Sequence, residues 1–187
     1  STRFAPIVLP LLGAHQLENC ATAVAALEIL NGAGGLPWEE PALKTGLEAV
    51  QWPGRFQMIE ETPPTIVDVA HNPDAARVLA QSLRERLPKR PLALVAGMLS
   101  DKDANSFFKE LAPLVHQCWL APLPGERNMP MARLKSAAVA AGLSPIESSI
   151  PGALAAARKW ACENHGGVCI AGSLVLAGEV LKLKGAS

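Results

Sequence analysis

The chain begins with two segments of helical pattern and continues with short apolar runs that alternate with further helical segments. Apolar residues that recur every three or four positions predict helices over residues 15–30 and 37–50. From residue 54 onward, runs of strand character alternate with amphipathic helices. The expected strands are 55–61, 65–70, 92–98, 117–121, 145–149 and 168–171, and the expected helices are 73–87, 103–114, 131–141, 152–164 and 174–183.

The central strands are nearly continuous apolar runs, which is typical of parallel strands covered by helices on both faces. The sequence therefore predicts an α/β fold, a doubly wound and mostly parallel sheet with helices on both sides. A break at residues 51–54 (QWPG) marks a domain boundary. We expect a short helical segment over 1–53, left from a preceding domain, and an α/β domain over 54–187.

Charge and composition exclude several classes of protein. The chain has 17 basic and 17 acidic residues and is 49% hydrophobic, so neither disorder nor a nucleic-acid partner is expected. No apolar run approaches the roughly 18 residues of a membrane span, so we expect no membrane partner. Arg3 and the apolar run 5–12 superficially resemble a signal peptide, but the chain begins with Ser1, two prolines interrupt the run, and the residues before Cys20 are not small. This favours an internal piece of a longer protein.

The four cysteines have no CxxC spacing, and Cys118 and Cys169 have apolar neighbours. We interpret all four as buried free thiols of a cytoplasmic protein, and we expect no metal site.

The residues that follow the strands are the candidates for chemistry, because ligands bind at the carboxyl ends of parallel strands. Asp68 lies within an apolar strand, where a carboxylate needs a partner. His71 follows that strand, and Asn72 and Pro73 fit the start of the next helix, whose end attracts anions. A capped turn with a surface histidine explains the same residues equally well.

Two later strand ends offer weaker candidates. Lys102 follows the strand 92–98 and could meet an anion, although a solvated lysine is the commoner explanation. Ser173 follows the strand 168–171 and could bind a ligand or simply cap the last helix. The sequence contains neither GxxxxGK[ST] nor GxGxxG, so no phosphate-binding loop of the usual kind is present.

Four ordered motifs resemble a known family. Residues 13–21 (GAHQLENCA) are similar to the GxHxxxNA motif of the Mur ligase superfamily. Residues 54–57 (GRFQ) and 68–73 (DVAHNP) resemble the more specific signature of the folylpolyglutamate synthase/dihydrofolate synthase family. Residues 97–103 (GMLSDKD) and 171–174 (AGSL) match its later motifs in the same order.

The resemblance implies an ATP-dependent ligase of folate biosynthesis. Such an enzyme phosphorylates a carboxylate of dihydropteroate or folate, and the amine of L-glutamate then attacks the acyl phosphate. The resemblance places Asn19 near adenine, Arg55 and Asp68 on the phosphates and ribose of ATP, and His71 and Ser173 near glutamate, with His71 also catalytic. Asn72 and Lys102 are weaker candidates.

The resemblance also implies ATP and Mg²⁺ as cofactors, a monomer, and small-molecule partners only: ATP, L-glutamate and dihydropteroate or folate. The phosphate loop and the Mg²⁺ ligands are expected in an N-terminal part outside this chain. The motifs fit a dihydrofolate synthase, a folylpolyglutamate synthase and an enzyme with both activities. The alternatives are a non-catalytic binding module with this fold and a related Mur-type amino-acid ligase.

Overall fold

The computed structural model describes residues 6–35 and 37–185. The chain divides into two compact units, Ser1–Pro53 and Gly54–Ser187, and each is described by itself. Which domains of a longer protein these units represent stays a prediction.

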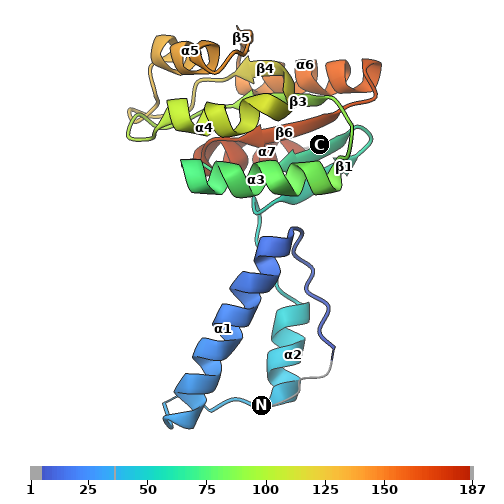
Figure 1. The fold of residues 1–187 in the computed structure, drawn as a ribbon, viewed down its shortest axis with the longest axis vertical. Coiled ribbons are helices and arrows are strands. Elements are labelled where there is room, and N and C mark those ends of the chain that lie inside the picture. The colour runs from blue at the N-terminus through green and yellow to red at the C-terminus, as the bar shows by residue number, and fades with distance from the viewer. Residues whose placement is uncertain (1–5, 36, 186–187) are drawn as a thin grey trace. The chain divides into compact units, whose positions relative to one another are not determined.

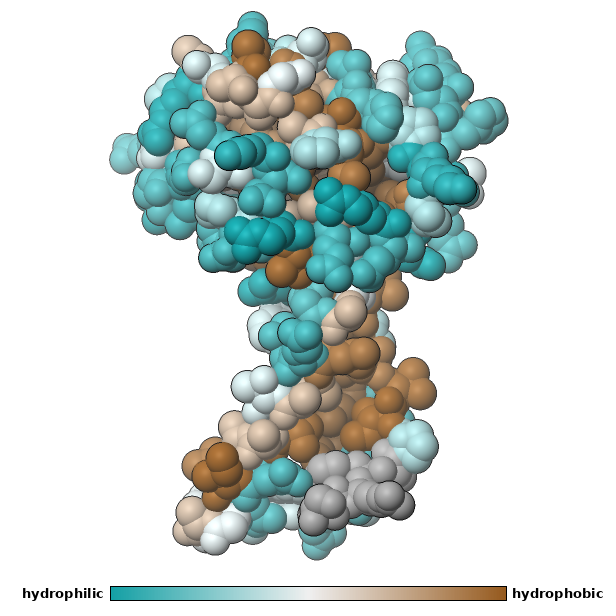
Figure 2. Space-filling model, viewed as in Figure 1, coloured by the Kyte–Doolittle hydropathy of each residue, from teal (hydrophilic) through white to brown (hydrophobic). Residues whose placement is uncertain are grey.

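The first unit contains two helices, α1 (Ala14–Gly32) and α2 (Glu40–Glu48), which confirms the two predicted from apolar spacing (Figure 1). Gln16 is the buried residue of α1, whereas Leu17, Ile29 and Leu30 are exposed. Of the apolar residues whose spacing predicted this helix, Cys20, Val24 and Leu27 are half-buried and Leu17 is exposed, so the pattern marks the less exposed face only in part. Figure 2 shows the resulting apolar surface on the unit.

The second unit is a six-stranded sheet in the order β1-β2-β6-β3-β4-β5. The edge strand β1 pairs antiparallel with β2, and every other pair is parallel. The strands are β1 (Gln57–Glu61), β2 (Pro64–Val67), β3 (Leu92–Ala96), β4 (Val115–Leu120), β5 (Pro145–Glu147) and β6 (Gly167–Ala171). The predicted mostly parallel sheet is confirmed.

Helices cover both faces of this sheet (Figure 1). Helices α3, α4 and α5 pack side by side on one face, and α6 and α7 pack on the other. Successive strand residues alternate between the two layers: Val95 and Ile170 join the core beneath α6 and α7, and the neighbouring Leu94 and Cys169 face the other layer. The helices are α3 (Pro73–Arg86), α4 (Ala104–Leu111), α5 (Met131–Ala140), α6 (Ile150–Glu163) and α7 (Leu174–Gly185), with a short 3₁₀ turn η1 (Ala112–Leu114) after α4.

The last strand in the chain, β6, lies between β2 and β3 in the middle of the sheet. The parallel registers place Val67 beside Ile170, and Ala96 beside Ala171. The segments that follow β2, β3 and β6 therefore all leave the sheet at the carboxyl ends of these parallel strands, at the point where the strand order reverses. Such a switch point is where ligands bind in open α/β sheets.

Four strands, β2 to β5, end one to three residues earlier than predicted, and the ends of β2 and β3 affect the site. β2 ends at Val67, so Asp68 follows the strand and does not lie within it. The backbone N–H of Asp68 still donates to the Ile170 carbonyl at 2.9 Å. The Asp68 carboxylate, however, accepts the Ala70 N–H, and the chain leaves the β-ladder at this point. β3 likewise ends at Ala96. No helix in the described part of the chain is both long and apolar enough to span a membrane.

Candidate active site

Asp68 holds two segments of main chain with its two carboxylate oxygens. Oδ2 accepts a hydrogen bond from the Phe56 N–H at 2.8 Å, and Oδ1 accepts one from the Ala70 N–H at 2.7 Å. Phe56 directly follows Arg55, and Ala70 directly precedes His71. The carboxylate therefore fixes the backbone beside both of these predicted site residues.

Arg55 lies between two residues with left-handed backbone conformation. Gly54 has φ 77° and Phe56 has φ 44°. The Phe56 ring is buried at 2% exposure, whereas the Arg55 side chain is exposed. The buried ring anchors the turn, and the Arg55 side chain is presented at the surface.

The imidazole of His71 is oriented by a backbone carbonyl. Its Nδ1 lies 2.8 Å from the Val69 carbonyl oxygen. A carbonyl oxygen only accepts, so Nδ1 carries the proton in this contact and Nε2 of the neutral ring has a lone pair. His71 is half-buried, and Nε2 can accept a proton or a hydrogen bond from an amine.

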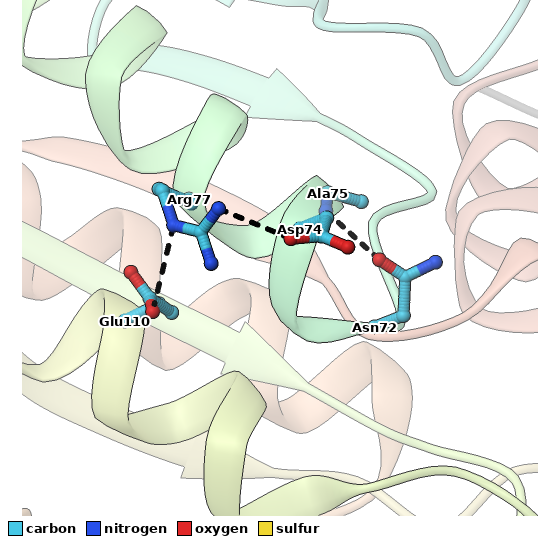
Figure 3. Close-up of polar contacts among 5 residues, drawn as sticks. All are labelled: Asn72, Asp74, Ala75, Arg77 and Glu110. Atoms are coloured by element: carbon cyan, nitrogen blue, oxygen red, sulfur yellow. Dashed lines mark hydrogen bonds and ion pairs between the residues drawn. The ribbon is translucent and has the colours of Figure 1, made fainter.

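Asn72 caps α3, which accounts for its side chain without a ligand. Its Oδ1 accepts from the Ala75 N–H at 2.8 Å (Figure 3). In the first turn, Asp74 pairs with Arg77 at 3.0 Å, and Arg77 reaches across to Glu110 of α4 at 3.8 Å. Side chains of the protein therefore stabilise the start of α3, which supports the alternative that Asn72 is a helix cap in a capped turn.

The chain after β6 approaches both neighbouring strand ends closely. The Gly172 N–H donates to the Ala70 carbonyl at 2.8 Å. A Cβ on Gly172, whose φ is 114°, would lie 2.8 Å from the Gly97 carbonyl oxygen and 3.0 Å from Met98 Cγ. Glycine is therefore required here, and the close approach brings the segments after β2, β3 and β6 together.

Ser173 follows Gly172 at the start of α7 and is 2% exposed. Its Oγ accepts from the Val175 N–H at 3.0 Å, a local bond at the beginning of the helix. The hydroxyl hydrogen has no acceptor among the described residues and is available to donate to a carboxylate.

Lys102 follows β3 but is engaged within its own loop. Its ammonium group pairs with Asp101 at 2.8 Å, and the hydrogen bond from Lys102 is the main cause that lowers the pKa of Asp101. Asp103 caps α4 by accepting from the Ser106 N–H at 3.1 Å, and hydrogen bonds from the Ser106 hydroxyl and then from its N–H lower the pKa of Asp103. The structure thus supports a local role for Lys102 more directly than an anion site.

Asn19 belongs to the first unit and lies exposed on α1. Its Nδ2 donates to Gln16 Oε1 at 3.3 Å, and Gln16 Nε2 lies 3.0 Å from His15 Nε2. The cluster at the sheet edge accordingly consists of Arg55, Asp68, His71 and Ser173, all from the second unit.

The cysteines are all free, but not all are buried. Cys118 and Cys169 lie in the sheet, where burial raises the pKa of Cys118 to about 12 and that of Cys169 further. Cys162 is exposed on α6 and Cys20 is half-buried on α1, which corrects the expectation that all four thiols are buried. Among residues 6–35 and 37–185, no three His, Cys, Asp or Glu side chains gather as a metal site.

The part of the chain that carries this cluster is similar to known proteins. The family model for the Mur ligase, glutamate ligase domain matches residues 54–174, which include the whole cluster. This chain belongs to that Mur ligase family. The Mur ligase match begins at Gly54, the first residue of the second unit.

Curated relatives carry more specific names. The dihydrofolate synthase/folylpolyglutamate synthase of Escherichia coli is 43% identical over 111 residues, which are 59% of this chain and 25% of that protein. The protein of the same name from Buchnera aphidicola is 34% identical over 172 residues, 90% of this chain and 39% of that protein. The chain thus spans between a quarter and two-fifths of these two relatives.

Solved structures show the same fold. Folylpolyglutamate synthase of Mycobacterium tuberculosis, complexed with ADP and AMPPCP, matches with a TM-score of 0.86 at 28% identity and covers 97% of this chain and 42% of that one. E. coli FolC in complex with ADP matches with a TM-score of 0.80 at 33% identity, covering 96% and 41%.

The sequence did not single out Gln57, whose amide oxygen accepts the Gly54 N–H at 2.9 Å. The motif GRFQ contains this residue, but a side-chain bond that closes a turn leaves no periodic signal. Gly97 was also missed, although a Cβ there would lie 2.7 Å from the Ala121 carbonyl oxygen. A glycine within the predicted strand 92–98 was the signal for this close approach.

Proposed function

We propose that this Mur ligase chain is the C-terminal part of a cytoplasmic, ATP-dependent ligase that joins L-glutamate to dihydropteroate or to folates. The observation that carries the proposal is the Asp68 carboxylate, which fixes the main chain beside Arg55 and beside His71 at one edge of the sheet. The names of the curated relatives and of the solved structures support it.

The nucleotide is bound by Asn19, Arg55 and Asp68. The exposed Arg55 guanidinium pairs with a phosphate through charge-assisted hydrogen bonds. The Asp68 carboxylate accepts from ribose hydroxyls in addition to the Phe56 and Ala70 N–H groups. The Asn19 amide offers a donor and an acceptor, the pair that recognises an adenine edge.

The glutamate is bound by His71 and Ser173. The Ser173 hydroxyl donates to a carboxylate of the amino acid. His71 Nε2 accepts a proton from the glutamate amine, since Nδ1 is already committed to the Val69 carbonyl. The amine then attacks the acyl phosphate, an amide bond forms, and phosphate leaves.

Mg²⁺ is proposed as the metal of the complete enzyme. Its ligands are proposed to lie in the part of the enzyme that carries the phosphate loop. Two of the solved relatives are complexes with AMPPNP and manganese, which supports a divalent metal beside the nucleotide. The enzyme is proposed to act as a monomer on small molecules.

The test is a ligase assay on the complete protein that carries this chain. ATP, Mg²⁺, L-glutamate and dihydropteroate, or a reduced folate in its place, should give ADP, phosphate and a product heavier by one glutamyl residue in mass spectrometry. The 187-residue chain is the control and should release no phosphate, because it lacks a phosphate loop. A complete protein that binds ATP but joins glutamate to neither acceptor would instead be a binding module.

A further inference from the structure

The turn that carries Arg55 is held from both sides by side chains. The Gly54 N–H donates to Gln57 Oε1 at 2.9 Å, and the Phe56 N–H donates to Asp68 Oδ2 at 2.8 Å. Arg55 lies between these two bonds. Neither acceptor is a backbone carbonyl, so the conformation of the turn depends on the chemistry of two particular side chains.

This conformation is unfavourable for the chain alone. Phe56 has φ 44°, a left-handed conformation that a non-glycine residue adopts only where its surroundings impose it. Gly54 has φ 77°, and a Cβ there would lie 3.0 Å from Val69 Cγ1. The backbone on both sides of Arg55 is therefore in a state that requires external support.

Three contacts provide that support. The buried Phe56 ring and the Asp68 carboxylate hold the second half of the turn. The amide of Gln57, the first residue of β1, holds the first half. Without the Gln57 acceptor, the Gly54 N–H loses the side-chain partner that closes the first half of the turn.

We propose that Gln57 is a positioning residue for Arg55, and that it sets the affinity for ATP by fixing the turn from which the guanidinium projects. This inference rests on the proposed role of Arg55 at the nucleotide phosphates. Gln57 itself touches no substrate in this proposal. Strained backbone is often found at ligand-binding positions, where the surrounding residues hold it in place.

The test uses Gln57→Met, which keeps the length of the side chain and removes the acceptor, and Gln57→Glu, which keeps an acceptor oxygen. In the complete enzyme, Gln57→Met should raise the KM for ATP about 2- to 10-fold, the factor for one neutral hydrogen bond, and leave the KM for glutamate unchanged. Gln57→Glu should stay within about twofold of the wild type. Gln81→Met is the matched control, because Gln81 bonds Glu85 on the exposed face of α3.

A double-mutant cycle separates positioning from a general structural effect. If Gln57 acts through Arg55, Gln57→Met should change the KM for ATP by less than about twofold in an Arg55→Ala background. Equal effects in both backgrounds, or a Gln57→Met enzyme with wild-type KM for ATP, would overturn the inference. If Arg55→Ala alone leaves the KM for ATP unchanged, the assignment of Arg55 to ATP fails instead. Circular dichroism checks that each variant is folded.

Discussion

Replacement of Asp68 by alanine should destabilise the second unit, whether or not any ligand is present. The carboxylate accepts hydrogen bonds from the Phe56 and Ala70 N–H groups at 2.8 and 2.7 Å. Alanine removes both acceptors, and it leaves two backbone donors at a sheet edge where main chain from three strands is closely packed.

The magnitude follows from these two bonds. A hydrogen bond to a charged acceptor contributes about 1.5–3 kcal/mol to stability, so two give about 3–6 kcal/mol. Asp68 is only half-buried, and water can replace part of what the carboxylate provides. We therefore expect a loss near the lower limit, about 3 kcal/mol in the free energy of unfolding.

The assay is urea unfolding of the 187-residue chain, followed by circular dichroism. Asp103→Ala is the control: Asp103 is also an aspartate that accepts a backbone N–H, but it makes one such bond, to Ser106, at an exposed helix start. Loss of that cap should cost about 1 kcal/mol. If Asp68→Ala costs no more than Asp103→Ala, the carboxylate does not hold the site together, and its role must be sought in direct contact with ATP.

Four further outcomes are expected. In the complete enzyme, Ser173→Ala should raise the KM for glutamate more than that for ATP, and His71→Ala should also lower kcat; an unchanged glutamate KM would leave Ser173 as a structural residue. Gly172→Ala should unfold the chain at markedly lower urea concentration, because the added Cβ would lie 2.8 Å from a carbonyl oxygen; an unchanged midpoint would show that the strand ends can separate freely. Residues 54–187 should melt cooperatively as a separate piece in circular dichroism and 1–52 should not; a cooperative melt of 1–52 would place the boundary elsewhere. The free energy of unfolding should fall as pH rises above about 8.5, by up to about 1.4 kcal/mol per pH unit for each buried thiol. Cysteines of the unfolded chain ionise in this range, whereas burial holds the pKa of Cys118 near 12 in the folded chain. Cys118→Ala should make the fall with pH less steep, and a slope equal to that of the wild type would contradict this explanation.

The sequence by itself determined the elements and the class of fold. Apolar runs such as 92–96 can only be buried on both faces, which requires helices on both sides of a mostly parallel sheet. Asn72 and Pro73 marked the start of α3, because capping is a local interaction between neighbouring residues. The motifs were also local, so they could be recognised without coordinates.

Tertiary structure alone decided how the strand ends meet. The insertion of β6 between β2 and β3 brings Gly172 against Ala70 and Gly97, over sequence distances that no local pattern spans. Tertiary structure also gave the Asp68 carboxylate a backbone partner twelve residues away, the Phe56 N–H, which no local pattern indicates. Solvent exposure also depends on tertiary structure. Helical spacing predicted α1, but other parts of the structure determine whether its apolar residues are covered, and Leu17 is exposed.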